Sequence, residues 1–184
     1  MRITSGIYKN RKLKMPAGIR PTQEKTRKAI FDIMGDISGL RFLELFAGSG
    51  AVGFEALSRQ VEEVVLVEDS RACQKVIQEA IRDWKIPNCS LLPLPVPKAI
   101  EILVKNNDRF DIIFMDPPYY QDWAKKILQS LSSCDILAPN GFVVAQTHKT
   151  ENLPDCQGGL ILFKRSVYGD TVLWFYKNKL NEVT

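Results

Sequence analysis

The sequence predicts an α/β fold with a mostly parallel sheet, and three observations carry that prediction. Apolar segments of strand length alternate with amphipathic segments of helix length between residues 41 and 146. Glycines 48 and 50 directly follow the first apolar segment, where a strand turns into a helix. The last two apolar segments are separated by a short turn at 168–170, which is typical of an antiparallel hairpin. The alternation implies helices on both faces of the sheet.

A basic segment precedes this alternation. Residues 2–15 alternate loosely between polar and apolar types around a turn residue, Gly6, which favours a β-hairpin or two paired short strands. Arg20-Pro21-Thr22 then predicts a helix start, because proline fixes φ and Thr22 can cap free N–H groups. An apolar stripe from Ala29 to Met34 would be the buried face of this helix. We therefore expect a β-hairpin extension over residues 1–20 and one domain over residues 21–184.

Seven strands and four further helices follow along the chain. Prolines 93, 95 and 97 weaken and end the third strand, and Pro139-Asn140-Gly141 predicts a turn before the fifth. The predicted strands are 41–46, 64–68, 89–94, 111–116, 142–146, 160–167 and 171–177, and the predicted helices are 51–59, 71–84, 99–105 and 123–131.

Charge is distributed unevenly along the chain. Residues 1–28 hold nine basic side chains and one acid, a net charge of +8, whereas the remainder holds 16 basic and 20 acidic side chains, a net charge of −4. A basic segment on a mildly acidic domain favours an anionic partner, most often nucleic acid, whose phosphates Lys and Arg contact. The alternative is a solvated face, and Arg20 and Thr22 can also serve only to start a helix. The predicted contacts are Arg2, Lys9, Arg11, Lys12, Lys14, Arg20 and Thr22.

Composition argues against several other classes of protein. No apolar run approaches the roughly 18 residues of a membrane span, and the first ten residues contain no apolar signal-peptide core. Four widely spaced cysteines without a CxxC pair favour free thiols in a reducing cytosol over a zinc site or a disulfide framework. Histidine catalysis would depend on His148, the only histidine, which we expect to be an ordinary surface residue. We expect a cytoplasmic monomer that has no metal and no membrane association.

A glycine loop provides the first candidate site. Residues 48–53 match the GxGxxG fingerprint, and Glu68 ends the next predicted strand. Glycines let the backbone approach a ligand closely, and an acid at this place can accept hydrogen bonds from both hydroxyls of a ribose. Glu44, inside the first strand, favours a cationic group such as the ammonium of a methionine moiety and would repel pyrophosphate. The pattern predicts a nucleoside-bearing cofactor, and a glycine turn without a ligand is the alternative.

The tetrapeptide Asp116-Pro117-Pro118-Tyr119 provides the second candidate site. It follows a strongly apolar strand, at the sheet end where α/β proteins bind ligands. The two prolines remove two N–H donors, so the Asp116 carboxylate and the Pro117 carbonyl offer two acceptors and no donor. That pair suits an exocyclic amino group, and Tyr119 offers a face on which a base can stack. A simple turn after a strand is the alternative.

These motifs resemble those of a known family of enzymes. FLELFAGSGAVGFEALSR, Glu68 and DPPY resemble the S-adenosylmethionine-dependent amino methyltransferases. Arg2-Ile3-Thr4-Ser5-Gly6, the basic stretch 9–14 and Arg20-Pro21-Thr22 are similar to the bacterial 16S ribosomal RNA guanine-N2 methyltransferases, of the small-subunit methyltransferase D type. The resemblance spans nearly the whole chain. It implies a Rossmann-like class I methyltransferase fold, S-adenosyl-L-methionine as cofactor, and methylation of a loop guanine in 16S rRNA of the small subunit or its assembly intermediate.

The resemblance also implies roles for individual residues. Asp116, Pro117 and Tyr119 would hold the target base and carry catalysis. The family's polar residue near the adenine ring is replaced here by Pro95-Val96-Pro97-Lys98, which leaves the adenine contact open. The residues that would bind the cofactor are Glu44, Phe46, Gly48, Ser49, Gly50, Glu68 and Asp69.

Three other functions remain open at this point. DPPY chemistry also serves adenine-N6 methylation of DNA or RNA. A non-catalytic RNA-binding assembly factor could retain a cofactor fold, although the intact Glu44, Glu68 and Asp116 argue against it. A small nicotinamide-binding protein would match the glycine pattern alone.

Overall fold

A computed structural model of the chain describes residues 1–16, 24–119 and 122–179. The predicted helix start at 20–22, and with it the predicted RNA contacts Arg20 and Thr22, lies outside these ranges. The chain forms two compact units, Met1–Val96 and Pro97–Thr184. No helix in the described ranges has the length and apolar character needed to cross a bilayer. All four cysteines are free thiols.

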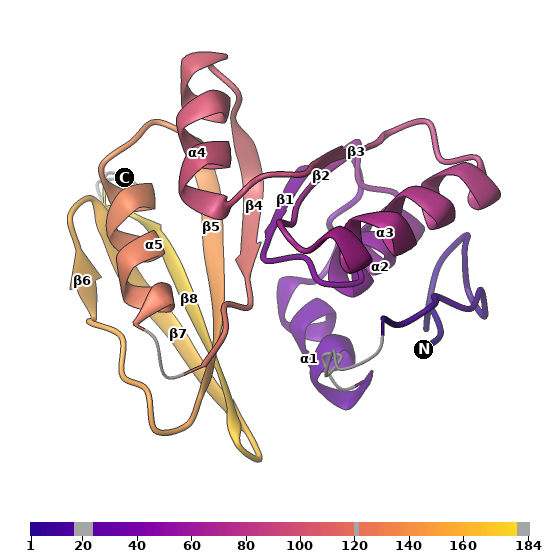
Figure 1. Ribbon diagram of the computed structural model, residues 1–184. Coiled ribbons are helices and arrows are strands. Elements are labelled where there is room, and N and C mark those ends of the chain that lie inside the picture. The colour runs from indigo at the N-terminus through magenta and orange to yellow at the C-terminus, as the bar shows by residue number, and fades with distance from the viewer. Residues whose placement is uncertain (17–23, 120–121, 180–184) are drawn as a thin grey trace. The chain divides into compact units, whose positions relative to one another are not determined.

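The first unit contains a parallel sheet with the strand order β3-β2-β1 (Figure 1). Four of the five residues of β1 and of β2 are buried, as expected for parallel strands whose two faces are covered. Helix α2 packs against β1 and β2, and α3 packs against β3. The elements are β1 (Arg41–Leu45), α2 (Ala51–Ser58), β2 (Glu63–Val67), α3 (Arg71–Trp84) and β3 (Cys89–Leu92).

The first unit also includes helix α1 (Glu24–Met34) and the N-terminal segment, residues 1–16. The segment forms a tight hairpin with one antiparallel bridge, Arg2 to Lys12, and its apolar residues Ile3 and Leu13 are buried. Helix α1 buries Thr26, Arg27, Ile30 and Phe31, so its buried face lies three positions, about one turn, earlier than the predicted stripe and contains a cation. Arg27 is fully buried, and it therefore contributes nothing to the exposed charge of the basic segment.

The second unit has the strand order β4-β5-β8-β7-β6 (Figure 1). β4 and β5 are parallel, and the remaining pairs are antiparallel, which confirms the predicted C-terminal hairpin. Helix α5 packs against β5 and β6. The elements are α4 (Val96–Lys105), β4 (Phe110–Met115), α5 (Trp123–Ser132), β5 (Leu137–His148), β6 (Cys156–Gln157), β7 (Leu160–Tyr168) and β8 (Thr171–Asn178).

The largest differences from the prediction concern β5, α4 and β6. β5 begins at Leu137 instead of residue 142, because the β4–β5 register shift between Phe110 and Ile112 absorbs the predicted turn within the strand. α4 begins at Val96, since Pro97 is tolerated in a first helical turn, where its missing N–H would be unpaired. β6 is a two-residue strand in addition to the seven predicted.

Candidate functional site

The loop between β1 and α2 is held in an unusual backbone conformation. Phe46, Gly48 and Gly50 all have positive φ, at 59°, 56° and 74°. The N–H of Gly50 donates to the carbonyl oxygen of Ala47 at 2.7 Å, which closes the turn. A positive φ costs glycine little but is unfavourable for a bulky residue such as Phe46. Strain of this kind is typical of ligand-binding loops.

The three glycines of the fingerprint have different surroundings. A Cβ on Gly50 would lie 2.9 Å from Cε2 of Phe54, and a Cβ on Gly53 would lie 2.5 Å from Cδ2 of Leu66, so both positions serve close packing of α2 on the sheet. A Cβ on Gly48 would meet nothing within 4 Å. Gly48 is therefore the glycine with open space beside its backbone, as a bound cofactor requires.

Two buried carboxylates accept N–H groups of the loop and of the first turn of α2. Glu44 is 3% exposed, and its Oε2 accepts the N–H of Gly53 at 2.8 Å. Glu68 accepts the N–H of Gly48 at 2.6 Å on one oxygen and the N–H of Ser70 at 2.8 Å on the other. Glu68 thus ties the glycine loop to the start of α3. Each carboxylate oxygen has two lone pairs, so these contacts leave acceptor capacity for a ligand.

The electrostatics of Glu68 are set mainly by burial. Desolvation raises the pKa of Glu68 above its ordinary value, while the N–H groups of Ser70 and Gly48 act in the opposite direction. A carboxyl group with a raised pKa binds its proton more tightly in the folded chain than in the unfolded chain, so this group favours folding most at acidic pH. Its contribution to stability falls as the pH rises through the folded pKa. Of the other predicted cofactor residues, Ser49 is buried and Asp69 is exposed.

We predict that Gly48→Ala abolishes cofactor binding at a small cost in stability. The methyl group would enter the open space, and the positive φ adds about 1–2 kcal/mol of backbone strain. Gly39→Ala is the matched control, because Gly39 has φ 73° and a Cβ there also meets nothing within 4 Å. Thermal unfolding and calorimetric titration with S-adenosylmethionine check both variants. Equal cofactor affinity in the two variants would contradict a ligand beside Gly48.

In the second unit, the predicted catalytic tetrapeptide directly follows β4. Asp116 is half-buried, Pro117 is buried, and Tyr119 is half-buried. Oδ2 of Asp116 accepts a hydrogen bond from Nε2 of Gln146 at 2.9 Å, from the neighbouring strand β5. This contact fixes the orientation of the carboxylate, because a glutamine can donate to it only through its NH₂ group.

Gln146 is a residue that the sequence reasoning did not select. It is 3% exposed, and its Oε1 has no hydrogen-bond partner in the described part of the chain. The available signal was a glutamine and a threonine at the end of the apolar run FVVA, since polar side chains are seldom buried without a partner.

We predict that Gln146→Glu shifts the pH dependence of methyl transfer. Two adjacent carboxyl groups cannot both ionise readily, so they share one proton over part of the pH range. Because the predicted role of Asp116 needs an ionised carboxylate, the acidic limb of the rate profile should move to higher pH. Gln146→Leu, which has no charge, should lower kcat without this shift. Single-turnover rates between pH 5 and 9 test the prediction, and superimposable profiles would refute it.

The only histidine of the chain lies beside the predicted base-stacking residue. The ring centroids of Tyr119 and His148 are 5.8 Å apart, with an interplanar angle of 50°. Nδ1 of His148 lies 2.9 Å from Oγ1 of Thr150. His148 is therefore placed to support the Tyr119 ring, a contact that sequence reasoning did not suggest. Within the described ranges, no group of three or more His, Cys, Asp and Glu side chains is arranged to hold a metal ion.

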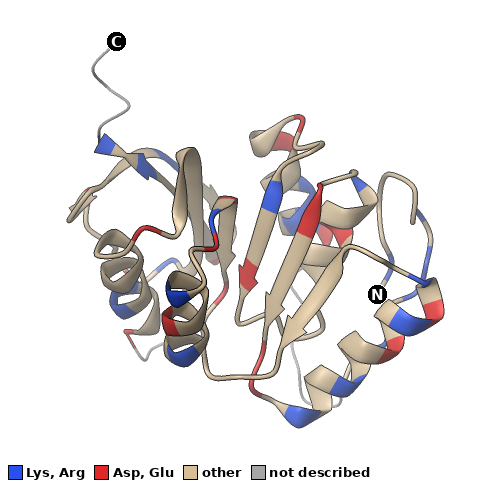
Figure 2. Ribbon diagram, turned by 90° about the horizontal axis from the view of Figure 1, so that it is seen from above, with Lys and Arg blue, Asp and Glu red and all other residues tan. Residues whose placement is uncertain are grey.

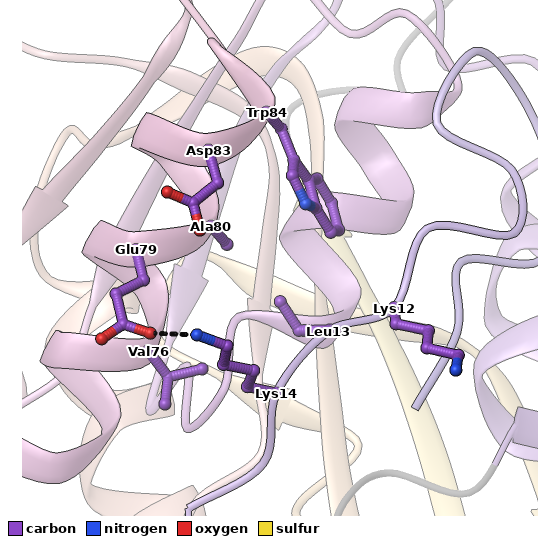
Figure 3. Close-up of a pocket in the computed structure, with 8 residues that line it drawn as sticks. All are labelled: Lys12, Leu13, Lys14, Val76, Glu79, Ala80, Asp83 and Trp84. Atoms are coloured by element: carbon purple, nitrogen blue, oxygen red, sulfur yellow. Dashed lines mark hydrogen bonds and ion pairs between the residues drawn. The ribbon is translucent and has the colours of Figure 1, made fainter.

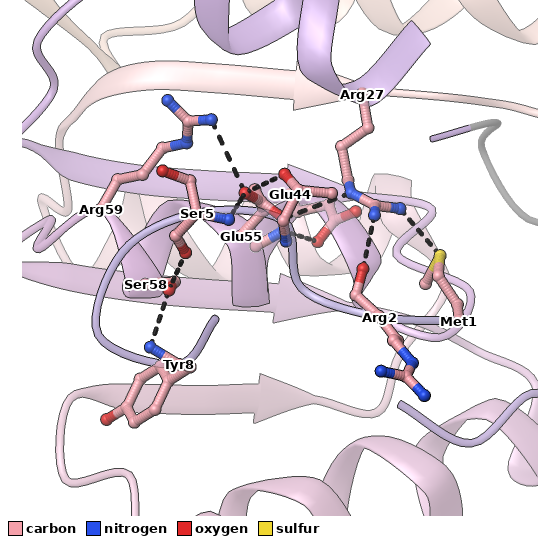
Figure 4. A network of polar contacts seen from close by, with 11 residues as sticks. Met1, Arg2, Ser5, Tyr8, Arg27, Glu44, Glu55, Ser58 and Arg59 are labelled. Carbon is pink, nitrogen blue, oxygen red and sulfur yellow. Dashed lines mark hydrogen bonds and ion pairs between the residues drawn. The ribbon is translucent and has the colours of Figure 1, made fainter. Parts of the chain in front are cut away.

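The N-terminal segment is held to α2 by a buried acid. Oε1 of Glu55 accepts from Oγ1 of Thr4 at 2.6 Å and from the N–H of Ser5 at 3.0 Å, and its Oε2 accepts from the N–H of Thr4 at 2.9 Å (Figure 4). Arg27 lies 3.4 Å from the same carboxylate and donates to the carbonyl oxygen of Arg2 at 2.7 Å. Glu55 and Arg27 are both fully buried. The docking of the segment thus depends on a desolvated ion pair.

Five of the predicted nucleic-acid contacts lie in this segment and are all exposed: Arg2, Lys9, Arg11, Lys12 and Lys14. The side chains of Lys14 and Arg11 also contact other residues of the chain. Lys14 forms an ion pair of 2.7 Å with Glu79 on α3, beside a small pocket of about 30 Å³ (Figure 3). The guanidinium of Arg11 lies 5.0 Å from the ring centroid of Tyr8 and 5.5 Å from that of Trp84.

Acids partly offset the basic residues around this segment. Figure 2 shows both basic and acidic positions along α3, and the acid Glu79 of this helix is the partner of Lys14. The exposed positive charge is therefore smaller than the sequence count of +8 suggests, because Arg27 is buried against Glu55 and Lys14 is paired with Glu79.

Comparison with known proteins finds relatives that match most of the chain. A curated relative from Bacillus subtilis, named "Putative rRNA methyltransferase YlbH", is 34% identical over 97% of this chain and 100% of its own length. "Ribosomal RNA small subunit methyltransferase D" of Haemophilus influenzae is 31% identical over 83% of this chain and 81% of its own length. The solved structure titled "Putative methyltransferase yhhF from Escherichia coli" is 27% identical, covers 97% of both chains and has a TM-score of 0.84.

The chain accordingly has the Rossmann-like fold of class I methyltransferases. A family model described as Conserved hypothetical protein 95 matches residues 1–177. The chain is therefore a member of the Conserved hypothetical protein 95 family, alongside relatives named small-subunit ribosomal RNA methyltransferase D.

Proposed function

We propose that this protein transfers a methyl group from S-adenosyl-L-methionine to the exocyclic N2 amine of a guanine in 16S rRNA of the small ribosomal subunit. The observation that carries the proposal is the Asp116 carboxylate, oriented by Gln146 and followed by the buried, N–H-free Pro117. The relatives are named as rRNA methyltransferases, one of them as putative, and these names support the reaction class and the RNA substrate.

The first unit supplies residues that fit the cofactor. The open backbone at Gly48 suits close approach of the methionine part, and Glu44 would attract its ammonium group. Glu68 would accept hydrogen bonds from the ribose hydroxyls. The rest of the cofactor site would be lined by Phe46, Ser49, Gly50 and Asp69. When bound, S-adenosylmethionine supplies an electrophilic methyl group on a sulfonium, whose departure from the methyl needs no proton transfer.

The second unit supplies residues that fit the methyl acceptor. A guanine N2 is a poor nucleophile, because its lone pair is delocalised into the ring. Hydrogen bonds from both N–H groups to Asp116 and to the Pro117 carbonyl would favour a pyramidal nitrogen with a localised lone pair. The carboxylate would also stabilise the positive charge that develops on nitrogen during attack. Tyr119, supported by His148, would stack on the base.

The remaining steps are positioning and access. Methyl transfer requires the nitrogen, the methyl carbon and the sulfur to align, so much of the rate enhancement comes from orientation. Guanine N2 is hard to reach inside a duplex, so the target base must be unpaired or flipped out. The exposed Arg2, Lys9 and Lys12 would contact RNA phosphates, and Arg11, Lys14, Arg20 and Thr22 remain predicted contacts. We propose that the protein acts as a cytoplasmic monomer on the subunit or its assembly intermediate.

One experiment tests the reaction and the position of the methyl group. Small subunits lacking the modification and naked 16S rRNA are each incubated with the protein and labelled S-adenosylmethionine, and the digested nucleosides are identified by mass spectrometry. N2-methylguanosine is the expected product. N6-methyladenosine would replace the guanine assignment with adenine methylation. RNA binding without any methylated nucleoside would instead identify a non-catalytic assembly factor.

A further inference from the structure

The C-terminal hairpin is a basic element in an otherwise acidic part of the chain. Residues 160–179 hold four basic side chains and one acid, a net charge of +3, whereas residues 29–159 hold 12 basic and 18 acidic side chains, a net charge of −6. The single acid, Asp170, is paired with Lys149 at 2.7 Å. The positive charge of the hairpin is therefore not neutralised by its own acid.

The same hairpin exposes an aromatic side chain. Phe163 on β7 is 48% exposed, although its ring centroid lies within 6.5 Å of both Phe142 and Phe175. The Nζ of Lys177 lies 6.0 Å from the centroid of the Phe163 ring. A half-exposed ring packed against the buried Phe175 and the half-buried Phe142, with an ammonium group at its face, is a rigid platform and not a loose surface side chain.

A β-bulge creates this arrangement. The register of β7 against β8 shifts between Leu162 and Lys164, so Phe163 is the additional residue of the bulge. Lys164 pairs with Phe175, and Lys177 lies two residues further along β8, so both lysines share the sheet face of Phe175. Consecutive residues of a regular strand point to opposite faces, whereas the bulge lets Phe163 join Lys164 on one face. We call Phe163, Lys164 and Lys177 the β7 patch.

Edge protection does not explain the whole patch. β7 pairs with β6 only through Leu160 and Ile161, and charged residues on such an edge prevent aggregation. That role accounts for Lys164, but an exposed phenylalanine would weaken it. A flat aromatic ring flanked by cations is instead the combination with which proteins bind single-stranded nucleic acid.

We propose that the β7 patch is a second RNA contact, in which an unpaired nucleotide stacks on Phe163 while Lys164 and Lys177 meet its phosphates. The proposal rests on the proposed RNA substrate and adds a contact outside the N-terminal segment. The patch positions RNA and takes no part in the methyl transfer itself.

Binding of a fluorescein-labelled single-stranded RNA oligomer, measured without cofactor, tests the patch independently of methylation. Phe163→Leu should weaken binding about tenfold because it keeps an apolar side chain but removes the stacking face. Phe163→Tyr keeps an aromatic face and should retain an RNA affinity within about twofold of the unmodified protein. Lys164→Ala should reduce the slope of log affinity against log salt by about 0.7, the value for one phosphate contact. Lys105→Ala, an exposed lysine on α4, is the charge-matched control and should change neither quantity.

Methyl transfer to small subunits provides the second readout. Phe163→Leu should raise the KM for subunits by a similar factor and leave kcat at saturation unchanged, since the patch contacts no reacting atom. Unchanged RNA affinity in Phe163→Leu would overturn the proposal, as would a higher KM for subunits with normal oligomer binding, which would indicate a protein partner on the subunit. If the unmodified protein binds the oligomer but does not methylate subunits, the proposed function is refuted. The oligomer-binding data would still test the β7 patch in that case.

Discussion

Asp116→Asn is expected to reduce the rate of methyl transfer at least about a hundredfold, while cofactor and RNA affinities stay within about twofold. Gln146 donates to Oδ2 of Asp116, so an asparagine would turn its own oxygen toward that donor. Its NH₂ group would then face the substrate amine, and two donors would oppose each other. The variant thus loses the negative charge and also presents the wrong hydrogen-bonding group.

Single-turnover methyl transfer with labelled S-adenosylmethionine measures this effect, and calorimetry and RNA binding measure the two affinities. Asp135→Asn makes the same chemical change at an exposed position of the same unit and should react at the normal rate. An Asp116→Asn variant with normal turnover would remove the carboxylate from the mechanism and leave the Pro117 carbonyl as the sole acceptor. Loss of RNA affinity in step with the rate would instead indicate a binding role.

The parts of the fold that were predictable from sequence are those set by local backbone chemistry. Glycines at 48 and 50 have the positive φ that a strand-to-helix turn requires, so their position in the sequence reveals the loop. The helix at 71–84 was predicted with the bounds that the structure has, because its apolar spacing is complete within the segment. The start of β5 was not predicted correctly, because it depends on a register shift against β4 that no local sequence pattern indicates.

The supporting contacts of the candidate site were not predictable for the same reason. Gln146 reaches Asp116 across 30 positions of the chain, and Lys14 reaches Glu79 across 65. Sequence shows that a residue is charged or polar, but only the fold shows what it faces. Arg27 illustrates the consequence: it was counted with the cations of an RNA-binding segment, and the structure buries it against Glu55.

The second large effect is expected at Glu55. Glu55→Ala would leave the Arg27 guanidinium buried without its carboxylate and would remove the acceptor of Thr4 and Ser5. Breaking a buried ion pair in this way costs about 3–5 kcal/mol, which corresponds to a fall of roughly 10 °C in the unfolding midpoint. Replacing both partners together, in Glu55→Leu with Arg27→Met, should recover much of that stability, because no unpaired charge remains.

A loss of stability would not by itself show that the ion pair serves to dock the N-terminal segment. A substitution at Gly6 separates loss of the ion pair from loss of docking. Gly6 has φ 77°, and a Cβ there would overlap the carbonyl oxygen of Ser58 on α2. Gly6→Ala should therefore release the segment while Glu55 and Arg27 remain paired, whereas Gly35→Ala, at φ 73° with open space around it, should not. Limited proteolysis detects release of residues 1–16. If release weakens RNA binding in Gly6→Ala while cofactor affinity is unchanged, the buried pair exists to present the exposed Arg2, Lys9 and Lys12 to RNA. Normal RNA affinity in a protein with a released segment would show that the segment does not need to be docked to bind RNA.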